Sequence, residues 1–425
     1  MLTRHDHLTI NRSTVSRRSF LHRMSAGALG MGALSMMDLL SLQAAELRQQ
    51  GRAMILLWMA GAPSQLETFD PKPNHANGGG TKSIKTSVPG IEIASSWEQT
   101  AKIMDDIALI RSMTNKEGNH LRATYQCHTG YIPSGGVKHP GFGSNVAQQL
   151  GDPNLELPSV VSVGPTQGAG FLGVDYEPFV VQQPGSLPAN VSSPVTQERL
   201  QRRLGLFNQL EDNFAIRGGQ AASDNQKRLY DKAAGVVLSP QTSAFDISSE
   251  PDALKARYGS NDFGKGCLLA RRLVEAGVTF VEVRMNGWDT HFDNASRCED
   301  LSRQVDPAMA TLITDLKDRG MLDRTTVVWM GEFGRTPRIN GRDGRDHFPR
   351  VFNVAMAGGG IRGGQVIGSS SPDGMEIADR PVSVPDLLST FCKSLEIDPN
   401  HENMSPLGRP IKIVDGGTPV ADLFG

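Results

Sequence analysis

The residue types best suited to chemistry in this chain are acids and histidines that stand beside apolar runs. Glu332 comes two residues after one such run, and His347 comes four residues before another. Asp289 and His291 follow a third run and are two residues apart, so in an extended chain their side chains point the same way. Carboxylate oxygen and imidazole nitrogen are ligands of divalent metals. We therefore predict that Asp289, His291, Glu332 and His347 bind a divalent metal ion. The residue types do not distinguish among zinc, calcium and magnesium.

The elements that must position these residues are buried strands. Nearly continuous apolar runs over residues 55–59, 278–283 and 327–330 indicate strands with both faces covered, as in a mostly parallel sheet. The carboxyl ends of parallel strands share one edge of the sheet, which is where α/β proteins place their sites. Each residue also has a structural interpretation: Asp289 could cap the next helix, and His347 could simply be a hydrogen-bonded histidine.

A fourth segment, residues 111–120, follows a strand and precedes a predicted helix. Helix N-termini stabilise anions, and a hydroxyl placed there can act as a nucleophile. We predict Thr114 or Ser112 as the nucleophile, His120 as a further catalytic residue and Asn119 as a substrate-binding residue. The competing interpretation is an ordinary helix cap, which needs no catalytic role.

Arginines are dense around the acid–histidine segment. They could clamp a phosphate or sulfate ester, because guanidinium matches these oxyanions in a bidentate way. We predict Arg335 and Arg345 as substrate-binding residues. The alternative is a solvated basic loop. The glycine-rich segment 358–364 lacks the lysine and spacing of a phosphate-binding loop, and it predicts tight turns only.

Helix and strand patterns alternate along the chain, which predicts one α/β domain over residues 46–425 with a helical insertion near 197–260. The spacing of apolar residues predicts which segments form strands and which form helices. The strands are 53–59, 107–111, 157–164, 278–283, 325–330 and 351–356; the helices are 98–104, 121–127, 253–258, 266–276, 301–319 and 385–394. Residues 74–90 and 167–196 are predicted to be loops.

Composition excludes some classes of function. The formal net charge is -2, so no basic field indicates nucleic acid as a partner. Four scattered cysteines include no C-x-x-C pair, although one or two disulfides would be allowed in an oxidising compartment.

The N-terminal segment has the features of an export signal. Arg17-Arg18 precedes a weakly apolar stretch, residues 24–42, that is rich in glycine and alanine. This resembles a twin-arginine signal peptide, which we place at residues 1–45. A short amphipathic helix is the alternative. The resemblance implies transport by the twin-arginine translocation machinery, a periplasmic or secreted protein, and no transmembrane domain after processing.

Several motifs together resemble one known family. They are SRRSFL, LLWMAGAPSQLETFDPKP, RSMTNKEGNH, GWDTHFDN and GEFGRTPRINGRDGRDHFP. The chain is similar to the secreted domain of unknown function 1501 family, which is grouped with the alkaline phosphatase and sulfatase superfamily. The resemblance implies an alkaline-phosphatase-like, three-layer α/β/α sandwich with a mostly parallel central sheet.

The resemblance also implies site roles. Glu332 would match the superfamily's strand-end metal acid, His347 its late metal histidine, and Asp289 and His291 its middle ligands. Two departures stand out. The first strand ends in Gly61-Ala62-Pro63, where the superfamily has a metal-binding Asp, and the sulfatase nucleophile signature is missing.

These observations support one leading hypothesis, an exported metal-dependent hydrolase of phosphate or sulfate esters. Its substrate would be a small-molecule or polysaccharide ester. The alternative is a non-catalytic binding or surface-associated protein on a degenerate hydrolase fold, which the missing first-strand Asp favours.

Overall fold

A twisted β-sheet runs through the centre of the described chain. The computed structural model describes residues 51–425 apart from 189–190, 192 and 194, so the predicted signal segment lies outside it. Among the described residues the sheet has nine strands, in the order β12-β4-β11-β8-β1-β7-β5-β6, with β15 beside β4. Their bounds are β12 Gln365–Ile367, β4 Ile107–Thr114, β11 Phe352–Ala357, β8 Thr325–Met330, β1 Ala53–Met59, β7 Phe280–Met285, β5 Val160–Val163, β6 Phe179–Val181 and β15 Val382–Ser383.

The sheet is mostly parallel, as expected, with one reversed strand. β1 pairs in parallel with both β7 and β8, whereas β11 runs antiparallel to β8 and β4. The start of β11 therefore lies at the same edge as the carboxyl ends of β8 and β4. This reversal matters for the site, because the residue that precedes β11 is brought to the edge where the other strands end.

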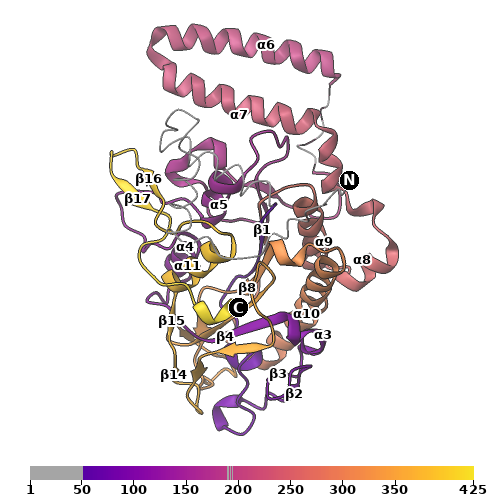
Figure 1. Ribbon diagram of the computed structural model, residues 1–425, viewed down its shortest axis with the longest axis vertical. Coiled ribbons are helices and arrows are strands. Elements are labelled where there is room, and N and C mark those ends of the chain that lie inside the picture. The colour runs from indigo at the N-terminus through magenta and orange to yellow at the C-terminus, as the bar shows by residue number, and fades with distance from the viewer. Residues whose placement is uncertain (1–50, 189–190, 192, 194) are drawn as a thin grey trace, which may run out of the picture. The chain divides into compact units, whose positions relative to one another are not determined.

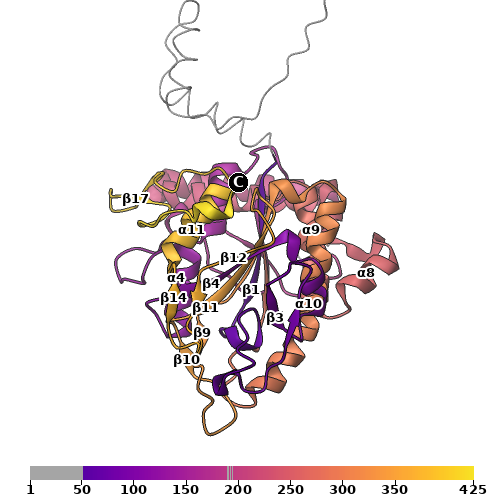
Figure 2. The same ribbon diagram turned by 60° about the horizontal axis from the view of Figure 1, so that its bottom comes forward.

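Helices cover both faces of the sheet (Figure 2). Alternate residues of β1 enter two different apolar cores: Ile55 and Leu57 face one, and Leu56 and Trp58 face the other. The first core contains α9 (Asp262–Glu275) and α10 (Asn294–Asp318), with α3 (Glu98–Lys102) and α8 (Asp252–Tyr258) near them. The second contains α5 (Phe142–Leu150) and α11 (Val384–Ser394), with α4 (His120–Thr129) beside them. The predicted three-layer arrangement is confirmed.

The long polar segment 197–238 forms two helices, α6 (Gln197–Phe214) and α7 (Gln220–Leu238). They run antiparallel as a hairpin, and α7 lies between α6 and the sheet-bearing part of the chain (Figure 1). No helix among the described residues is both long and apolar enough to cross a bilayer.

Several short elements were wrong or missing in the sequence prediction. The helix predicted at 301–319 begins at Asn294 as α10, and α5 was not expected because its first turn contains Gly, Ser and Asn, which are weaker helix formers. The predicted loops contain β6 and β2 (Ser83–Lys85), whose three-residue length gives no periodic signal. The remaining strands form small ribbons: β2 with β3 (Glu92–Ala94), β9 (Gly334–Arg335) with β10 (His347–Phe348), β13 (Ser369–Ser370) with β14 (Ile377–Asp379), and β16 (Glu402–Met404) with β17 (Pro410–Lys412).

All four cysteines are buried with free thiols. Burial raises the pKa of Cys298 to about 12, so this thiol stays protonated at neutral pH. These side chains act as small core residues.

Candidate metal centre

Segments from four strands meet at one edge of the sheet. Asp289 and His291 follow β7, and Glu332 follows β8. His120 is the first residue of α4, which follows β4. His347 opens β10, ahead of the reversed strand β11, and reaches the same edge for that reason. Residues separated by up to 227 positions, such as His120 and His347, are thus brought into contact.

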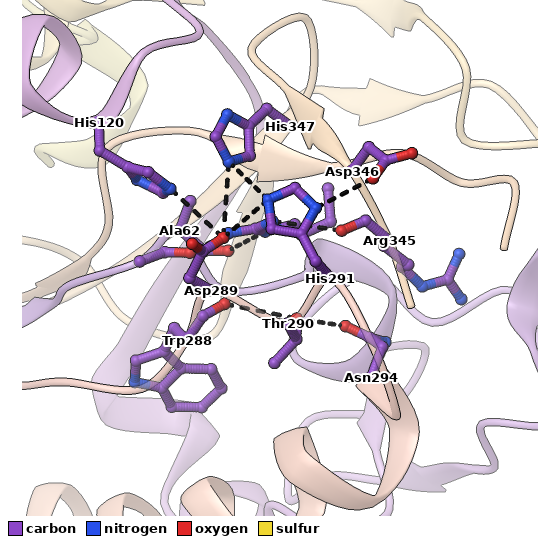
Figure 3. Close-up of polar contacts among 12 residues, drawn as sticks. Ala62, His120, Trp288, Asp289, Thr290, His291, Asn294, Arg345, Asp346 and His347 are labelled. Atoms are coloured by element: carbon purple, nitrogen blue, oxygen red, sulfur yellow. Dashed lines mark hydrogen bonds and ion pairs between the residues drawn. The ribbon is translucent and has the colours of Figure 1, made fainter. Parts of the chain in front are cut away.

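The imidazoles of three histidines surround the carboxylate of Asp289 (Figure 3). Asp289 Oδ1 lies 3.3 Å from Nε2 of His120, 3.1 Å from Nε2 of His291 and 3.5 Å from Nε2 of His347. Nε2 of His291 is 3.0 Å from Nε2 of His347. Ligand atoms held ~2.0–2.1 Å from a tetrahedral zinc ion are about 3.3 Å apart. The observed separations match that spacing, and ligand atoms of His120, Asp289 and His347 all lie within 4.8 Å of one another.

The other ring nitrogen of each histidine is held by an acceptor. Nδ1 of His120 lies 2.6 Å from Oε1 of Glu332, Nδ1 of His291 lies 3.0 Å from Oδ1 of Asp346, and Nδ1 of His347 lies 2.8 Å from the Gly118 carbonyl oxygen. An acceptor at Nδ1 keeps the proton there and leaves the Nε2 lone pair free. Metal-binding histidines are oriented in this way by carboxylate or carbonyl partners.

Arg335 supplies a fixed positive charge beside Asp289. Its guanidinium is fully buried, lies 2.6 Å from Oδ1 of Asp289 through Nη2, and also donates to the carbonyl oxygens of Gly61 and Ala62. Burial by itself raises the pKa of Asp289, but the hydrogen bond and charge of Arg335 outweigh it and lower the pKa to about 2. Asp289 therefore carries a negative charge at any ordinary pH.

The environment shifts the pKa values of His120 and His347 in opposite directions. Burial lowers the pKa of His120, but the hydrogen bond and charge of Glu332 raise it above its usual value overall. The pKa of His347 is lowered, first by burial and then by the positive charge of Arg335, against the effect of its bond to Gly118. The neutral form of His347 is thus favoured, and a metal at Nε2 of His120 would compete with a proton.

Two observations show that the residues fit a cation. Nε2 of His120 is buried and has no hydrogen-bond partner among the described residues. With neutral imidazoles, the carboxylates of Asp289, Glu332 and Asp346 and the single guanidinium of Arg335 leave a formal charge of -2 (three negative groups against one positive). A divalent cation at the common point would satisfy the nitrogen and neutralise this charge.

The loop that carries Asp289 is rigidly anchored. Trp288 is fully buried and meets Trp329 of β8 edge-on, with ring centroids 6.4 Å apart. Gly61 approaches the backbone of this loop so closely that a Cβ there would lie 2.4 Å from the nitrogen of Asp289, and its φ is +109°. The end of β1 therefore delivers backbone groups to the site: the Gly61 N–H donates to Glu332 Oε1 at 3.0 Å. This explains why no acid can occupy position 61.

A cleft of about 430 Å³ opens beside the cluster. Its lining includes Gly61, His120, Asp289 and Glu332 from the site, and it continues to Arg284. The other residues that line it are Ala60, Leu121, Thr124, Tyr125, His128, Pro165, Thr166, Gln167 and Asn286. A larger cavity, of about 750 Å³, is lined by none of the clustered histidines, so the smaller cleft is the one that a reacting ligand can share with the site.

The structure does not bring every predicted site residue to the cluster. Ser112 is fully buried in β4, and its Oγ lies against Gly368. Thr114 ends β4 and pairs with β15. Asn119 caps α4, where its Oδ1 accepts from the backbone nitrogens of residues 121 and 122, so the ordinary-cap interpretation describes it. Arg345 is fully buried and donates from Nη2 to Glu67 at 2.7 Å, so its guanidinium is not available to a substrate.

The alternative interpretations of the other residues fare differently. Asp289 does not cap a helix, because α10 starts at Asn294 with Asp293 before it. Glu332 contacts His120 and Gly61 through the same oxygen, so its carboxylate fixes the orientation of the His120 imidazole. The guanidinium of Arg335, predicted to bind substrate, instead donates hydrogen bonds to Asp289 and to backbone carbonyl oxygens.

Sequence reasoning left out two contributors, Asp346 and Asn115, and gave a third, His120, a different role. It placed His120 among catalytic residues and not among candidate ligands, and it gave no role to Asp346, whose position next to His347 was a usable signal. Asn115 is also part of the site, because its Nδ2 donates to the Glu332 carbonyl oxygen at 2.8 Å. Nothing in the local sequence of Asn115 indicates this contact.

Comparison with solved structures finds weak similarities. They include the PsFucS1 sulfatase from Pseudoalteromonas sp. (14% identity, TM-score 0.38, 86% of this chain and 72% of that chain covered). They also include the lipoteichoic acid synthase LtaP from Listeria monocytogenes (10%, 0.40, 88% and 80%) and the C-terminal periplasmic domain of EcEptC from Escherichia coli in complex with Zn (10%, 0.37, 88% and 94%). Similarities this weak assign no ligand or activity to this chain.

Comparison at the level of sequence gives a family. No curated protein matches the chain. A family model described as "Protein of unknown function (DUF1501)" matches residues 51–424, which is nearly all of the described chain. The chain therefore belongs to the DUF1501 family.

Proposed function

We propose that this chain is an exported, metal-dependent hydrolase of phosphate or sulfate esters. His120, Asp289, His291 and His347 are the proposed metal ligands. The observation that carries the proposal is the shared pattern of three imidazoles, each with Nδ1 held by an acceptor and Nε2 directed at the Asp289 carboxylate. Its motifs resemble the DUF1501 family, and the grouping of that family with the alkaline phosphatase and sulfatase superfamily supports the same class of reaction.

The donor set favours zinc or a similar transition metal. Imidazole nitrogens suit zinc, whereas calcium and magnesium take mostly oxygen ligands. Such an ion, when bound, would polarise an ester oxygen and stabilise the negative charge that develops during hydrolysis.

The protein residues have complementary roles in this proposal. Glu332, Asp346 and the Gly118 carbonyl orient the histidines, and Arg335 holds Asp289 in its ionised form. The cleft beside the cluster receives the substrate. Arg284 lines that cleft and is partly exposed, so it can contact a second polar or anionic part of the ester.

The nucleophile in this proposal is water. None of the described serine, threonine or tyrosine hydroxyls hydrogen-bonds to the four ligands, and Ser112 is fully buried. We therefore do not carry Ser112 or Thr114 forward as nucleophiles. In the reaction a bond forms from the water oxygen to phosphorus or sulfur, the ester bond breaks, and the proton goes to the departing alcohol.

Ester hydrolysis by the reconstituted protein tests the proposal. The chain is loaded with zinc, manganese, calcium or magnesium and assayed with aryl phosphate monoesters, aryl phosphate diesters and aryl sulfates. We expect zinc or manganese to support hydrolysis, and Asp289→Asn to abolish both metal binding and turnover. Asp318→Asn, which changes an exposed aspartate at the end of α10, is the matched control.

The same experiment separates the two hypotheses. Metal binding without hydrolysis of any ester would favour the alternative, a binding protein on a degenerate hydrolase fold. Export is tested separately: cell fractionation of the intact chain and of an Arg17→Lys/Arg18→Lys variant should place only the former outside the cytoplasm.

A further inference from the structure

The two helices of the α6–α7 hairpin contact each other through the sides that face one another. The rings of Phe207 and Tyr230 stack with centroids 4.1 Å apart, and Ser223 Oγ donates to the Glu211 carbonyl oxygen at 2.9 Å. Lys227 of α7 forms an ion pair with Asp212 of α6. These contacts join the two helices without using the outward side of α6.

α7 is the helix that attaches the hairpin to the rest of the chain. Arg228 and Lys232 reach Asp175, at 3.4 Å and 3.8 Å, in the short helical segment Val174–Tyr176. α6 lies on the far side of α7 from the sheet (Figure 1). One face of α6 is therefore turned away from the other described elements.

That face carries large apolar side chains. Leu206, Leu210 and Phe214 are 62%, 70% and 52% exposed. They are spaced four residues apart, so they form one stripe along the helix. Contiguous exposed apolar side chains of this size mark an interaction surface.

The same face is basic. At 100° per residue, Arg199 and Arg203 fall within about 20° of the mean direction of the apolar stripe, and Arg202 falls about 80° from it. Among the described residues, none of these arginines is in an ion pair, and all three are exposed. The acids of α6 lie away from this direction: Asp212 is paired with Lys227 toward α7, and Glu198 and Glu211 fall about 100° or more from the mean direction of the stripe.

We propose that this face of α6, defined by Arg199, Arg202, Arg203, Leu206, Leu210 and Phe214 and called here the basic apolar face, docks on an anionic lipid bilayer. An amphipathic helix with arginines beside a stripe of Leu and Phe lies in the plane of the bilayer surface: its apolar side chains enter the acyl boundary and its cations meet the headgroups. The chain as a whole carries a net charge of -2, so the attraction is local to this face.

Other occupants fit the face less well. A second copy with its α6 parallel to this one would place unpaired arginines of one helix near those of the other, and an antiparallel copy would place them against Leu210 and Phe214, which offer no charge. A nucleic acid offers phosphates to the arginines but nothing to cover three exposed apolar side chains. A bilayer matches both features. The proposal is independent of the hydrolase activity, because no residue of α6 lines the cleft or the metal cluster.

Vesicle cosedimentation of the full chain tests the proposal. The probes are vesicles of phosphatidylcholine alone and of phosphatidylcholine mixed with phosphatidylglycerol. We expect binding to the mixed vesicles only, with an affinity that falls as salt is raised. The variant Arg199→Gln/Arg202→Gln/Arg203→Gln should bind on the order of a hundredfold more weakly, and Leu206→Ser/Leu210→Ser/Phe214→Ser should also lose binding.

A matched variant controls for charge. Arg257→Gln/Arg303→Gln/Arg324→Gln removes three exposed arginines from other elements and should bind like the parent chain. Circular dichroism checks that each variant retains its helices. Failure of the parent chain to bind mixed vesicles, or binding by both α6 variants at the parent level, would overturn the proposal. A concentration-dependent dimer without lipid that the apolar variant abolishes would overturn it in favour of a second copy.

Discussion

Nδ1 of His120 lies 2.6 Å from Oε1 of Glu332, and the same oxygen accepts the Gly61 N–H at 3.0 Å. This pair of bonds connects the ends of three strands, β1, β4 and β8, through one carboxylate that is almost fully buried. Because Nδ1 of His120 is held by Glu332, the imidazole ring is fixed with Nε2 directed toward Asp289.

Glu332→Gln tests the orienting role of this carboxylate. The amide keeps the shape but loses the charge that holds the imidazole proton, so metal affinity should fall about 10–100-fold with the fold intact. Competition with a chromophoric chelator measures the affinity. Glu156→Gln, at an exposed glutamate, is the control and should change nothing. An affinity equal to that of the parent would mean that Glu332 does not orient His120.

Arg345→Gln distinguishes a structural from a substrate-binding role for Arg345. The guanidinium is fully buried and contacts Glu67 at 2.7 Å, so its removal leaves an unpaired buried carboxylate and should cost about 3–5 kcal/mol in the free energy of unfolding. Urea denaturation measures this loss, and metal affinity should stay unchanged. A variant of normal stability with a raised KM for ester substrates would restore the role that the sequence suggested.

His128 makes the stability of the fold depend on pH. Burial lowers the pKa of His128, but the charge and hydrogen bond of Glu282, 3.2 Å from Nε2, raise it above its usual value overall, against the opposing charge of Arg284. A raised pKa in the folded state means that this pair stabilises fully below the unfolded pKa of about 6.5, and that its contribution is lost as pH rises through the folded pKa.

The comparison of parent and His128→Gln chains isolates this effect. Urea unfolding at about pH 6 and about pH 8.5 should give a difference in unfolding free energy between the two chains that is larger at the lower pH. His75→Gln, at an exposed histidine, should track the parent at both pH values. A parent-minus-variant difference that grows with pH would contradict the assigned direction of the pKa shift.

The sequence was informative where a residue directly follows a long strand. Asp289, His291 and Glu332 each stand within six residues of the end of β7 or β8, and each of these strands contains a mostly apolar run of four residues. Parallel pairing then brings their ends together, so the common edge could be predicted. His347 was also identified, although it reaches the edge for a different reason, the reversal of β11, which no apolar run can reveal.

The parts that escaped prediction depend on contacts between distant segments. The role of Arg345 could not be read from its dense arginine neighbourhood, because Glu67, its partner, is 278 residues away. Asn119 and His120 are adjacent, yet Asn119 caps α4 and His120 enters the cluster. The conformation of the first turn of α4 determines which of the two side chains reaches the cluster. Similarly, glycine at position 61 looked like a lost ligand, whereas its close approach to Asp289 explains its presence.

The most direct test of the account is the metal content of the purified chain after exposure to zinc and removal of excess ion. Elemental analysis should find about one zinc per parent chain, and X-ray absorption should show nitrogen and oxygen ligands at ~2.0–2.1 Å with an imidazole signature. His347→Ala should remain folded and lose the ion, while His75→Ala should keep it. Full zinc occupancy in His347→Ala, with an unchanged absorption spectrum, would contradict the proposed centre.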